Sequence, residues 1–141
     1  MRYFIFNLVD GDRERAVSLL HAKMWTIDGG ERHCDALNPG DLVLVFVALT
    51  REFVGHAELG TAFLDRLAQD PAMSDRAQSG VMFRKVVEWT SGVQLDLAVQ
   101  RIDPTATNPY VQANAAGFRA GVVQITASEY GIVMALREEA R

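Results

Sequence analysis

One stretch at the end of the first third of the chain constrains the fold more than any other. Residues 42–48 form a continuous apolar run, Leu-Val-Leu-Val-Phe-Val-Ala, which is rich in β-branched residues. The run is too short for a typical helix and is typical of a strand that is buried on both faces. An Asn-Pro-Gly turn signal at 38–40 precedes it, a second turn is expected at 49–52, and 53–63 follows as the return strand. The sequence therefore predicts a central β-hairpin.

The return strand contains two glycines that shape the predicted sheet. Gly55 and Gly60 are positions where a strand can bulge or bend sharply. A buried strand with a glycine-kinked partner suits the corner of a small closed sheet. We therefore interpret the hairpin as the middle of a small β-barrel.

Length and composition limit the classes of protein to be considered. A chain of 141 residues, of which 49% are hydrophobic and 23% charged, suits one ordered domain with one core. A net charge of −4 argues against a general polyanion binder, whose affinity comes mainly from neutralising phosphates, but it leaves room for a local basic patch.

Cysteine content and hydropathy favour a cytoplasmic protein. Cys34 is the only cysteine, so an internal disulfide is excluded, as is usual in a reducing compartment. The apolar start at 3–9 is too short and lacks the flanks of a signal peptide. Because no run approaches the roughly 20 residues that cross a bilayer, we expect no membrane association.

The first half of the chain outside the hairpin predicts one strand and one helix. Residues 3–9 read as a strand, which is apolar apart from Asn7. Asp12 is placed to cap a helix that begins at the next residue. The polar segment 65–79, which contains Pro71, fits either a single helical turn or a long mobile excursion.

The second half predicts another strand and further helices. Residues 81–89 alternate with period two, which predicts a long strand that ends in a Thr-Ser-Gly turn at 90–92. The next segment, 93–102, fits either a strand or the start of a helix.

The carboxyl-terminal segment contains two helix signals. A short helix over 110–116 begins after Asn-Pro and ends at a glycine. A strand follows within 118–125, and a capping box from Thr126 to Glu129 begins the last helix. A mixed or antiparallel sheet with helices beside it places the chain in the α+β class.

Landmarks along nearly the whole chain resemble those of an EVE domain, a member of the PUA-like superfamily. They lie at 2–7, Trp25, 40–44, 53–58 and 118–132. The resemblance implies that residues 1–141 form a single domain, a PUA-like small mixed β-barrel flanked by short helices. The chain departs from the family pattern at 7–10, where Lys-Ser-Glu-Pro is common, and at 25–30, where Trp-Asp-Gly-Val-Arg-Asn is common.

The resemblance also implies a function without catalysis. Related domains bind a modified base, 5-methylcytosine or another, in DNA or RNA, and hold it in an aromatic pocket at the mouth of the barrel. A reader of this kind meets its base unpaired or flipped out of the duplex, stacks it on rings and reads its edge with polar groups. The partner expected from the resemblance is nucleic acid with a modified base, together with a nuclease or defence protein. No cofactor or metal is expected.

The residues to which the resemblance assigns these roles fall into two groups. The base-binding pocket is assigned to Trp25, Asn7, Phe46, Ala48 and Asn114. Contacts to the nucleic acid are assigned to Arg32, Arg51, Arg84 and Arg119. Trp25 is the expected stacking platform, and the alternative for Trp25 and Phe46 is a place in the core. For Asn7 the alternative is a hydrogen bond to the backbone.

Two other functions stay open at this point. The same pocket suits a regulatory or adaptor domain that binds a small molecule. A metal-dependent hydrolase would use His56 and Glu58, which share one face of a strand. A zinc deaminase is excluded because its Pro-Cys-x-x-Cys half is absent, and the sequence contains no nucleophile elbow, P-loop or dinucleotide fingerprint.

Overall fold

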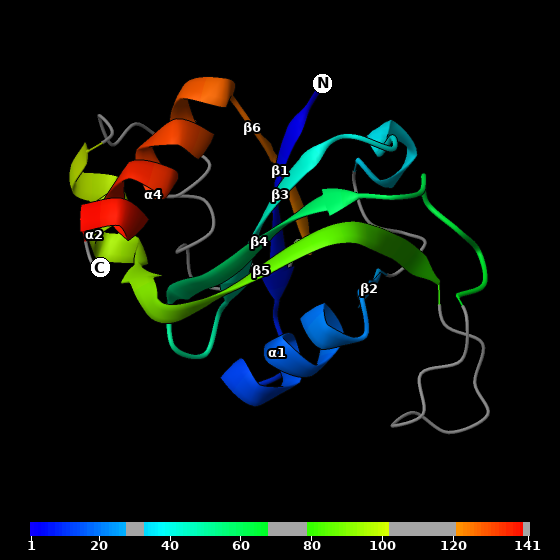
Figure 1. Cartoon of the computed structure of the whole chain (residues 1–141), viewed down its shortest axis with the longest axis horizontal. Helices are drawn as coiled ribbons and strands as arrows, with labels where there is room; N and C mark the ends of the chain where they lie inside the picture. Colours follow the sequence, from blue (N-terminus) through cyan, green and yellow to red (C-terminus); the bar gives the residue numbers. More distant parts are fainter. Residues whose placement is uncertain (28–32, 68–78, 102–120, 140–141) are drawn as a thin grey trace.

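The computed structural model of the chain describes residues 1–27, 33–67, 79–101 and 121–139 (Figure 1). Its strands are β1 Tyr3–Leu8, β2 Met24–Thr26, β3 Leu42–Val47, β4 Glu52–Leu59, β5 Gly80–Gln94 and β6 Val122–Ile125. Its α-helices are α1 Arg13–His21, α2 Leu95–Arg101 and α4 Ala127–Glu139, and Cys34–Ala36 forms a turn of 3₁₀ helix. Two predicted segments fall largely or wholly outside the described residues: the helix over 110–116 and most of the segment 65–79. The assignment of the chain to a single domain stays a prediction.

The six strands form one mixed sheet in the order β2-β5-β4-β3-β1-β6. β1 and β3 run parallel, and the other neighbouring pairs are antiparallel. The sheet is strongly twisted and curls into a half-barrel, with β2 and β6 as its two edge strands (Figure 1). The predicted α+β class is confirmed, and among the described residues the predicted barrel takes this half-open form.

Helices cover the sheet on both faces, so the core has two parts (Figure 1). The first part lies between the sheet and α1 and includes Phe6, Leu20 and Trp25. The second lies between the sheet and the pair α2 and α4 and includes Phe46 and Trp89. Because neighbouring residues of a strand point to opposite faces, the strands β1, β3, β4, β5 and β6 each contribute side chains to both parts.

The predicted hairpin is confirmed as β3 and β4, although β4 ends at Leu59 rather than at Phe63. β4 bulges next to Gly55, where the sequence predicts a bend. Phe46 pairs with Phe53, but the preceding residue of β3, Val45, pairs with Gly55, so Val54 is an extra residue in β4.

The predicted turn at 90–92 is wrong, because β5 continues through it. Glu88 pairs with Gly55 and Val93 pairs with Phe53, so residues 89–92 of β5 form a large bulge opposite Val54 of β4. The Thr-Ser-Gly sequence suits this bulge as well as it suits a turn. The ambiguous segment that follows is the helix α2, so the helical alternative is confirmed.

Two short polar motifs fix the ends of elements as predicted. Asp12 accepts a hydrogen bond from Arg15 N at 2.9 Å and caps α1. Thr126 Oγ1 accepts from Glu129 N at 3.1 Å and Glu129 Oε1 accepts from Thr126 N at 3.0 Å, which is the predicted capping box of α4. None of the helices in the described part of the chain is long and apolar enough to cross a membrane.

The Gly-Asp turn before β3 joins two strands. Asp41 is 4% exposed, and its carboxylate accepts from Arg2 N at 2.9 Å and from Asn38 N at 3.0 Å. Gly40 adopts a φ of +94°, which favours glycine. The motif therefore holds the start of β1 beside the start of β3, which sets the register of the parallel pair.

Candidate functional site

Trp25, the expected stacking platform, lies in the core beneath α1. It is 2% exposed on the edge strand β2. Its ring centroid is 6.2 Å from that of Phe6 and 6.5 Å from that of Phe83, and the Phe6 and Phe83 centroids are 6.1 Å apart. The three rings therefore pack against one another in the core. Trp25 thus lies in the core, which was the alternative to a stacking platform. Its contact with a base stays a prediction.

Three other pocket residues lie together on the opposite face of the sheet. Asn7 and Phe46 are paired in register near the carboxyl ends of the parallel strands β1 and β3, so their side chains point to the same side. They are 3% and 1% exposed, and Phe46 packs on Phe53 with the ring centroids 5.0 Å apart. Ala48, two residues beyond Phe46, is partly exposed against the same core.

The predicted pocket is therefore divided by the sheet. The structure brings Asn7, Phe46 and Ala48 together, and it separates them from Trp25. The backbone N–H of Asn7 donates to Gly121 O at 2.8 Å, which ties this end of β1 to the residue before β6. The fifth pocket residue, Asn114, lies outside the described residues.

The two described arginines of the predicted nucleic-acid contacts lie beside opposite ends of β4, Arg51 just before its first residue and Arg84 on the neighbouring strand β5. Arg51 follows the hairpin tip, and its Nη2 is 2.7 Å from Asp96 Oδ1. Arg84 pairs with Glu58, whose pKa is held below its usual value mainly by this hydrogen bond. About six residues of strand, roughly 20 Å, separate the two ends. They do not form one basic rim, and Arg32 and Arg119 lie outside the described residues.

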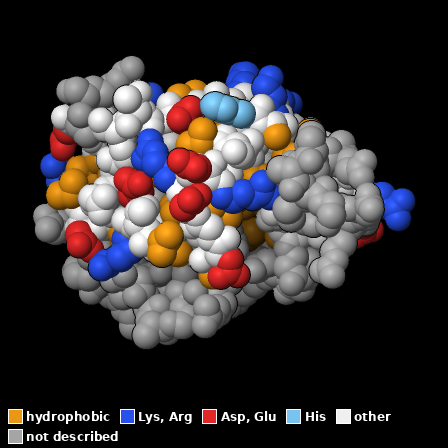
Figure 2. Space-filling view, turned by 90° about the horizontal axis from the view of Figure 1, so that it is seen from below, with side chains coloured by type: hydrophobic (Ala, Val, Ile, Leu, Met, Phe, Trp, Pro, Cys, Tyr) orange, Lys and Arg blue, Asp and Glu red, His pale blue; other side chains and the backbone are white. Residues whose placement is uncertain are grey.

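The face that carries α1 shows mixed charge. Figure 2 views this face from below and shows basic and acidic side chains interspersed, with hydrophobic side chains between them. Two of the pairs that join α1 to the sheet are Arg13 with Glu52, at 3.3 Å, and His21 with Glu88, at 3.0 Å. This pattern suits a solvated surface more than a surface that attracts a polyanion.

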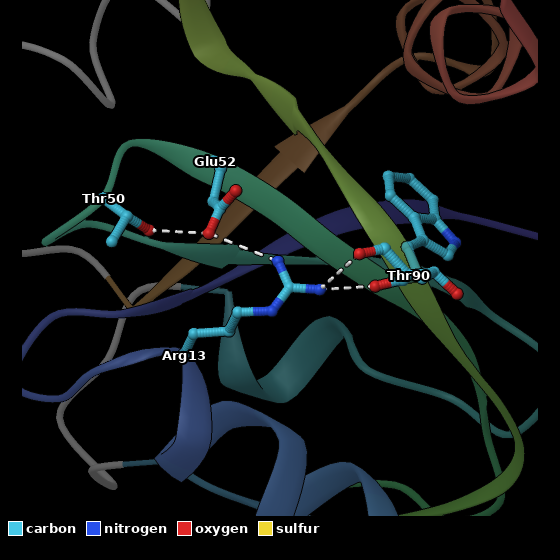
Figure 3. Close-up of polar contacts among 5 residues, drawn as sticks. Arg13, Thr50, Glu52 and Thr90 are labelled. Carbon is cyan, nitrogen blue, oxygen red and sulfur yellow. Dashed lines mark hydrogen bonds and ion pairs between the residues drawn. The ribbon is translucent and has the colours of Figure 1, made fainter. Parts of the chain in front are cut away.

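A polar cluster that the sequence analysis missed lies next to the hairpin tip (Figure 3). Arg13, the first residue of α1, reaches the β5 bulge and donates from Nη2 to the backbone oxygens of Trp89 and Thr90. Its Nη1 is 3.3 Å from Glu52 Oε1, and the Thr50 hydroxyl donates to the same oxygen at 3.1 Å. The guanidinium thus supplies hydrogen-bond donors to carbonyls in the bulge, where β5 leaves its regular pairing with β4.

Arg13→Ala should lower the free energy of unfolding by about 1–3 kcal/mol, because it removes the guanidinium partner of two carbonyls and a carboxylate. Urea denaturation at neutral pH measures this loss. Arg66→Ala removes an equal charge from an exposed position and should leave stability within about 0.5 kcal/mol of wild type. Equal stability of the two variants would show that Arg13 does not hold the bulge.

The pair considered for a metal site is engaged in other contacts. His56 and Glu58 do share a face of β4, as the alternation predicts. His56 Nδ1 accepts a hydrogen bond from Trp89 Nε1 at 2.8 Å, and Glu58 is bound by Arg84 and lies 3.9 Å from Lys85. In the part of the chain that the structure describes, no three His, Cys, Asp or Glu side chains are grouped to hold a metal ion.

The parallel β1–β3 pair inside a curled mixed sheet, with α1 on one face and α4 on the other, defines a PUA-like α+β fold. This confirms the fold that the resemblance to EVE domains implied.

Solved structures of the same fold cover the chain almost completely. A hypothetical protein from Leishmania major aligns with a TM-score of 0.68 at 19% identity, over 99% of this chain and 96% of that one. Human THYN1, in complex with DNA that contains 5-methylcytosine, aligns with a TM-score of 0.64 at 14% identity, over 98% of each chain. The YTH domain-containing protein mmi1, in complex with RNA, aligns with a TM-score of 0.60 at 15% identity, over 99% of this chain and 83% of that one. The sequence matches no protein-family model and no curated protein.

Proposed function

We propose that this domain binds nucleic acid, DNA or RNA, that carries a modified base, and that it does so without catalysing a reaction. The observation that carries the proposal is the fold shared with human THYN1, whose structure contains 5-methylcytosine DNA and which aligns over 98% of both chains. The fold shared with mmi1, whose structure contains RNA, adds support for a nucleic-acid partner. A nuclease or defence partner and a cytoplasmic location belong to the same proposal.

The residues proposed to contact the base are those that the structure brings together near the carboxyl ends of β1 and β3. The Asn7 amide supplies both a donor and acceptors for a base edge, and Phe46 supplies a ring. Ala48 is partly exposed, and its small side chain is the least obstruction to a planar group that approaches Phe46. Because Asn7 and Phe46 are almost fully buried, a base can reach them only if neighbouring side chains move.

Energetics set what such a site can achieve. Stacking contributes roughly 1–3 kcal/mol per base. A methyl group that fits an apolar pocket contributes about 1–3 kcal/mol more. Stacking strengthens the binding of both forms of the base, so only the contribution of the methyl group distinguishes them. About 1.4 kcal/mol from the methyl group gives a tenfold preference for the methylated base, without requiring a large positively charged surface.

A titration with matched oligonucleotides tests the proposal. Single-stranded DNA, duplex DNA and RNA, each with and without methylated bases, are titrated at low salt by fluorescence anisotropy. We expect at least one methylated oligonucleotide to bind about tenfold more tightly than its unmethylated match. Equal affinity for every matched pair, or no binding at low salt, would contradict the proposal.

A pair of variants at the hairpin tip locates the site. Ala48→Trp places a large ring near Phe46, where it should block the approach of a base, and should remove the preference for the methylated base. Leu49→Trp places the same ring at the next residue, where the native side chain is 72% exposed, and should leave the preference intact. If both variants lost the preference for the methylated base equally, the base would not bind next to Ala48.

A regulatory domain that binds a small molecule is the second candidate. The charge distribution favours it, because the two described arginines assigned to nucleic acid are both paired with acidic side chains and the net charge is −4. For such a domain, the free modified base would bind as tightly as the oligonucleotide that contains it.

A further inference from the structure

One hydrogen bond joins two rings on the face of the sheet that α4 covers. The indole N–H of Trp89 donates to Nδ1 of His56 at 2.8 Å, and the two ring centroids are 5.7 Å apart. An indole nitrogen can only donate, so His56 Nδ1 must be unprotonated. The imidazole is therefore neutral and carries its proton on Nε2.

The same indole contacts a cation on α4. The guanidinium carbon of Arg137 lies 5.4 Å from the centroid of the Trp89 ring, a favourable cation–π distance. Trp89 is 1% exposed and packs in one cluster with Val133 and Leu136 of α4. The ring of Trp89 is thus the contact through which His56 and α4 are connected.

The charged and titratable side chains of the elements around His56 are largely paired with one another. On β4 and β5, Glu58 pairs with Arg84 and Lys85, Glu52 with Arg13 of α1, and Glu88 with His21 of α1. On α2 and α4, Asp96 pairs with Arg51 at the hairpin tip, Arg101 with Glu139, and Arg137 with Glu138. Also on α4, Tyr130 packs on the ring of Tyr3, and Glu129 accepts a hydrogen bond from Thr126 N.

Burial, and to a smaller extent the charge of Arg137, lower the pKa of His56 below its ordinary value. Both effects keep the ring neutral at neutral pH, in agreement with the direction of the hydrogen bond.

We propose that the Trp89–His56 hydrogen bond is a pH-sensitive latch that holds α4 against the sheet at neutral pH and opens in acid. Protonation places an N–H on Nδ1, where it faces the indole N–H, so two donors meet and the bond is lost. It also adds a second cation near Arg137 in a half-buried place. The Trp89 ring then loses one of its two polar contacts, and the packing of α4 on the sheet loosens.

The direction of the pH dependence follows from the lowered pKa. The unfolded chain protonates His56 near pH 6.5, and the folded chain does so at lower pH. Between these two values the unfolded state binds more protons, so the folded state loses stability as the pH falls through this window. The loss is complete below the folded pKa, and the contribution is fully present above the unfolded one.

The two tryptophans of the chain allow a direct test by NMR. The indole ¹H–¹⁵N resonances are followed while the pH falls from about 7.5 to about 5, the range in which histidine titrates. We expect the Trp89 resonance to shift with a midpoint below about 6.5 and the Trp25 resonance, which lies on the other side of the sheet, to stay in place. A Trp89 resonance that does not move, or that moves together with that of Trp25, would overturn the proposal.

A pair of variants separates the effect of His56 from that of the exposed His21. His56→Gln keeps an acceptor for the indole but does not titrate, so it should cancel most of the fall in Tm of the wild type between about pH 7 and about pH 5. His21→Gln removes an imidazole whose side chain is 66% exposed and should keep that fall. If the Tm of His56→Gln fell between these pH values as much as that of the wild type, the latch would also be overturned.

Discussion

Gly55→Ala should lower the free energy of unfolding by about 3 kcal/mol, because the added methyl has no space. A Cβ at this position would lie 2.7 Å from the backbone oxygen of Val87 and 2.9 Å from Leu20 Cδ1. Neither neighbour can withdraw easily, since Val87 O belongs to the adjacent strand β5 and Leu20 is buried in α1. Thermal and urea denaturation of the purified variant measure the loss.

Gly131→Ala is the matched control for this substitution. Gly131 lies in the exposed part of α4, and a Cβ there would meet nothing within 4 Å. Alanine favours the helix over glycine, so this variant should gain roughly 0.5–1 kcal/mol. If both variants were as stable as wild type, this result would contradict the close packing of β4 against β5 and α1 at Gly55.

Trp25→Ala should cost about 3–5 kcal/mol of stability, because it removes one of the three rings that fill the core beneath α1. Trp25→Phe keeps a ring and should lose less. Leu49→Ala, at a side chain that is 72% exposed, is the control and should be nearly neutral. Chemical denaturation measures all three variants.

The same variant distinguishes the two interpretations of Trp25. If Trp25→Ala folds as stably as wild type but loses its preference for the modified base, the indole contacts the ligand, as the resemblance implies. If it loses stability as expected here, any effect on binding is a consequence of the damaged core.

Local signals in the sequence predicted the elements that depend on local chemistry. The apolar run at 42–48, the cap at Asp12 and the capping box at Thr126 each act within a few residues, and the structure confirms all three elements. The bend at Gly55 was predictable for a similar reason, since a glycine inside a strand indicates a close approach of backbones.

Features that depend on distant pairing were not predictable. The Thr-Ser-Gly sequence at 90–92 has the composition of a turn, and only the pairing of β5 with β4 on both sides makes it a bulge. Nothing in the local sequence indicates the role of Arg13, because its partners Glu52, Trp89 and Thr90 are far away in the sequence.

The arrangement of the candidate site also depends on pairing between distant segments, which the sequence does not reveal. The resemblance assigned Trp25 and Phe46 to one pocket, but which face of the sheet a side chain joins depends on strand order and register. β2 pairs with β5 at the edge of the sheet that the structure describes and faces α1, whereas Phe46 faces the opposite side.

The most direct test of a base-reading domain uses a free nucleoside, because it carries no phosphates and only the base pocket can recognise it. Methylated cytidine and adenosine and their unmethylated forms are titrated into the ¹⁵N-labelled protein and followed by two-dimensional NMR. We predict that a methylated nucleoside shifts the amide resonances of Asn7, Phe46 and Ala48 in a saturable manner, and that its unmethylated form binds about tenfold more weakly. Equal shifts for both forms, or none with any of the four nucleosides, would contradict the recognition of a modified base by this domain.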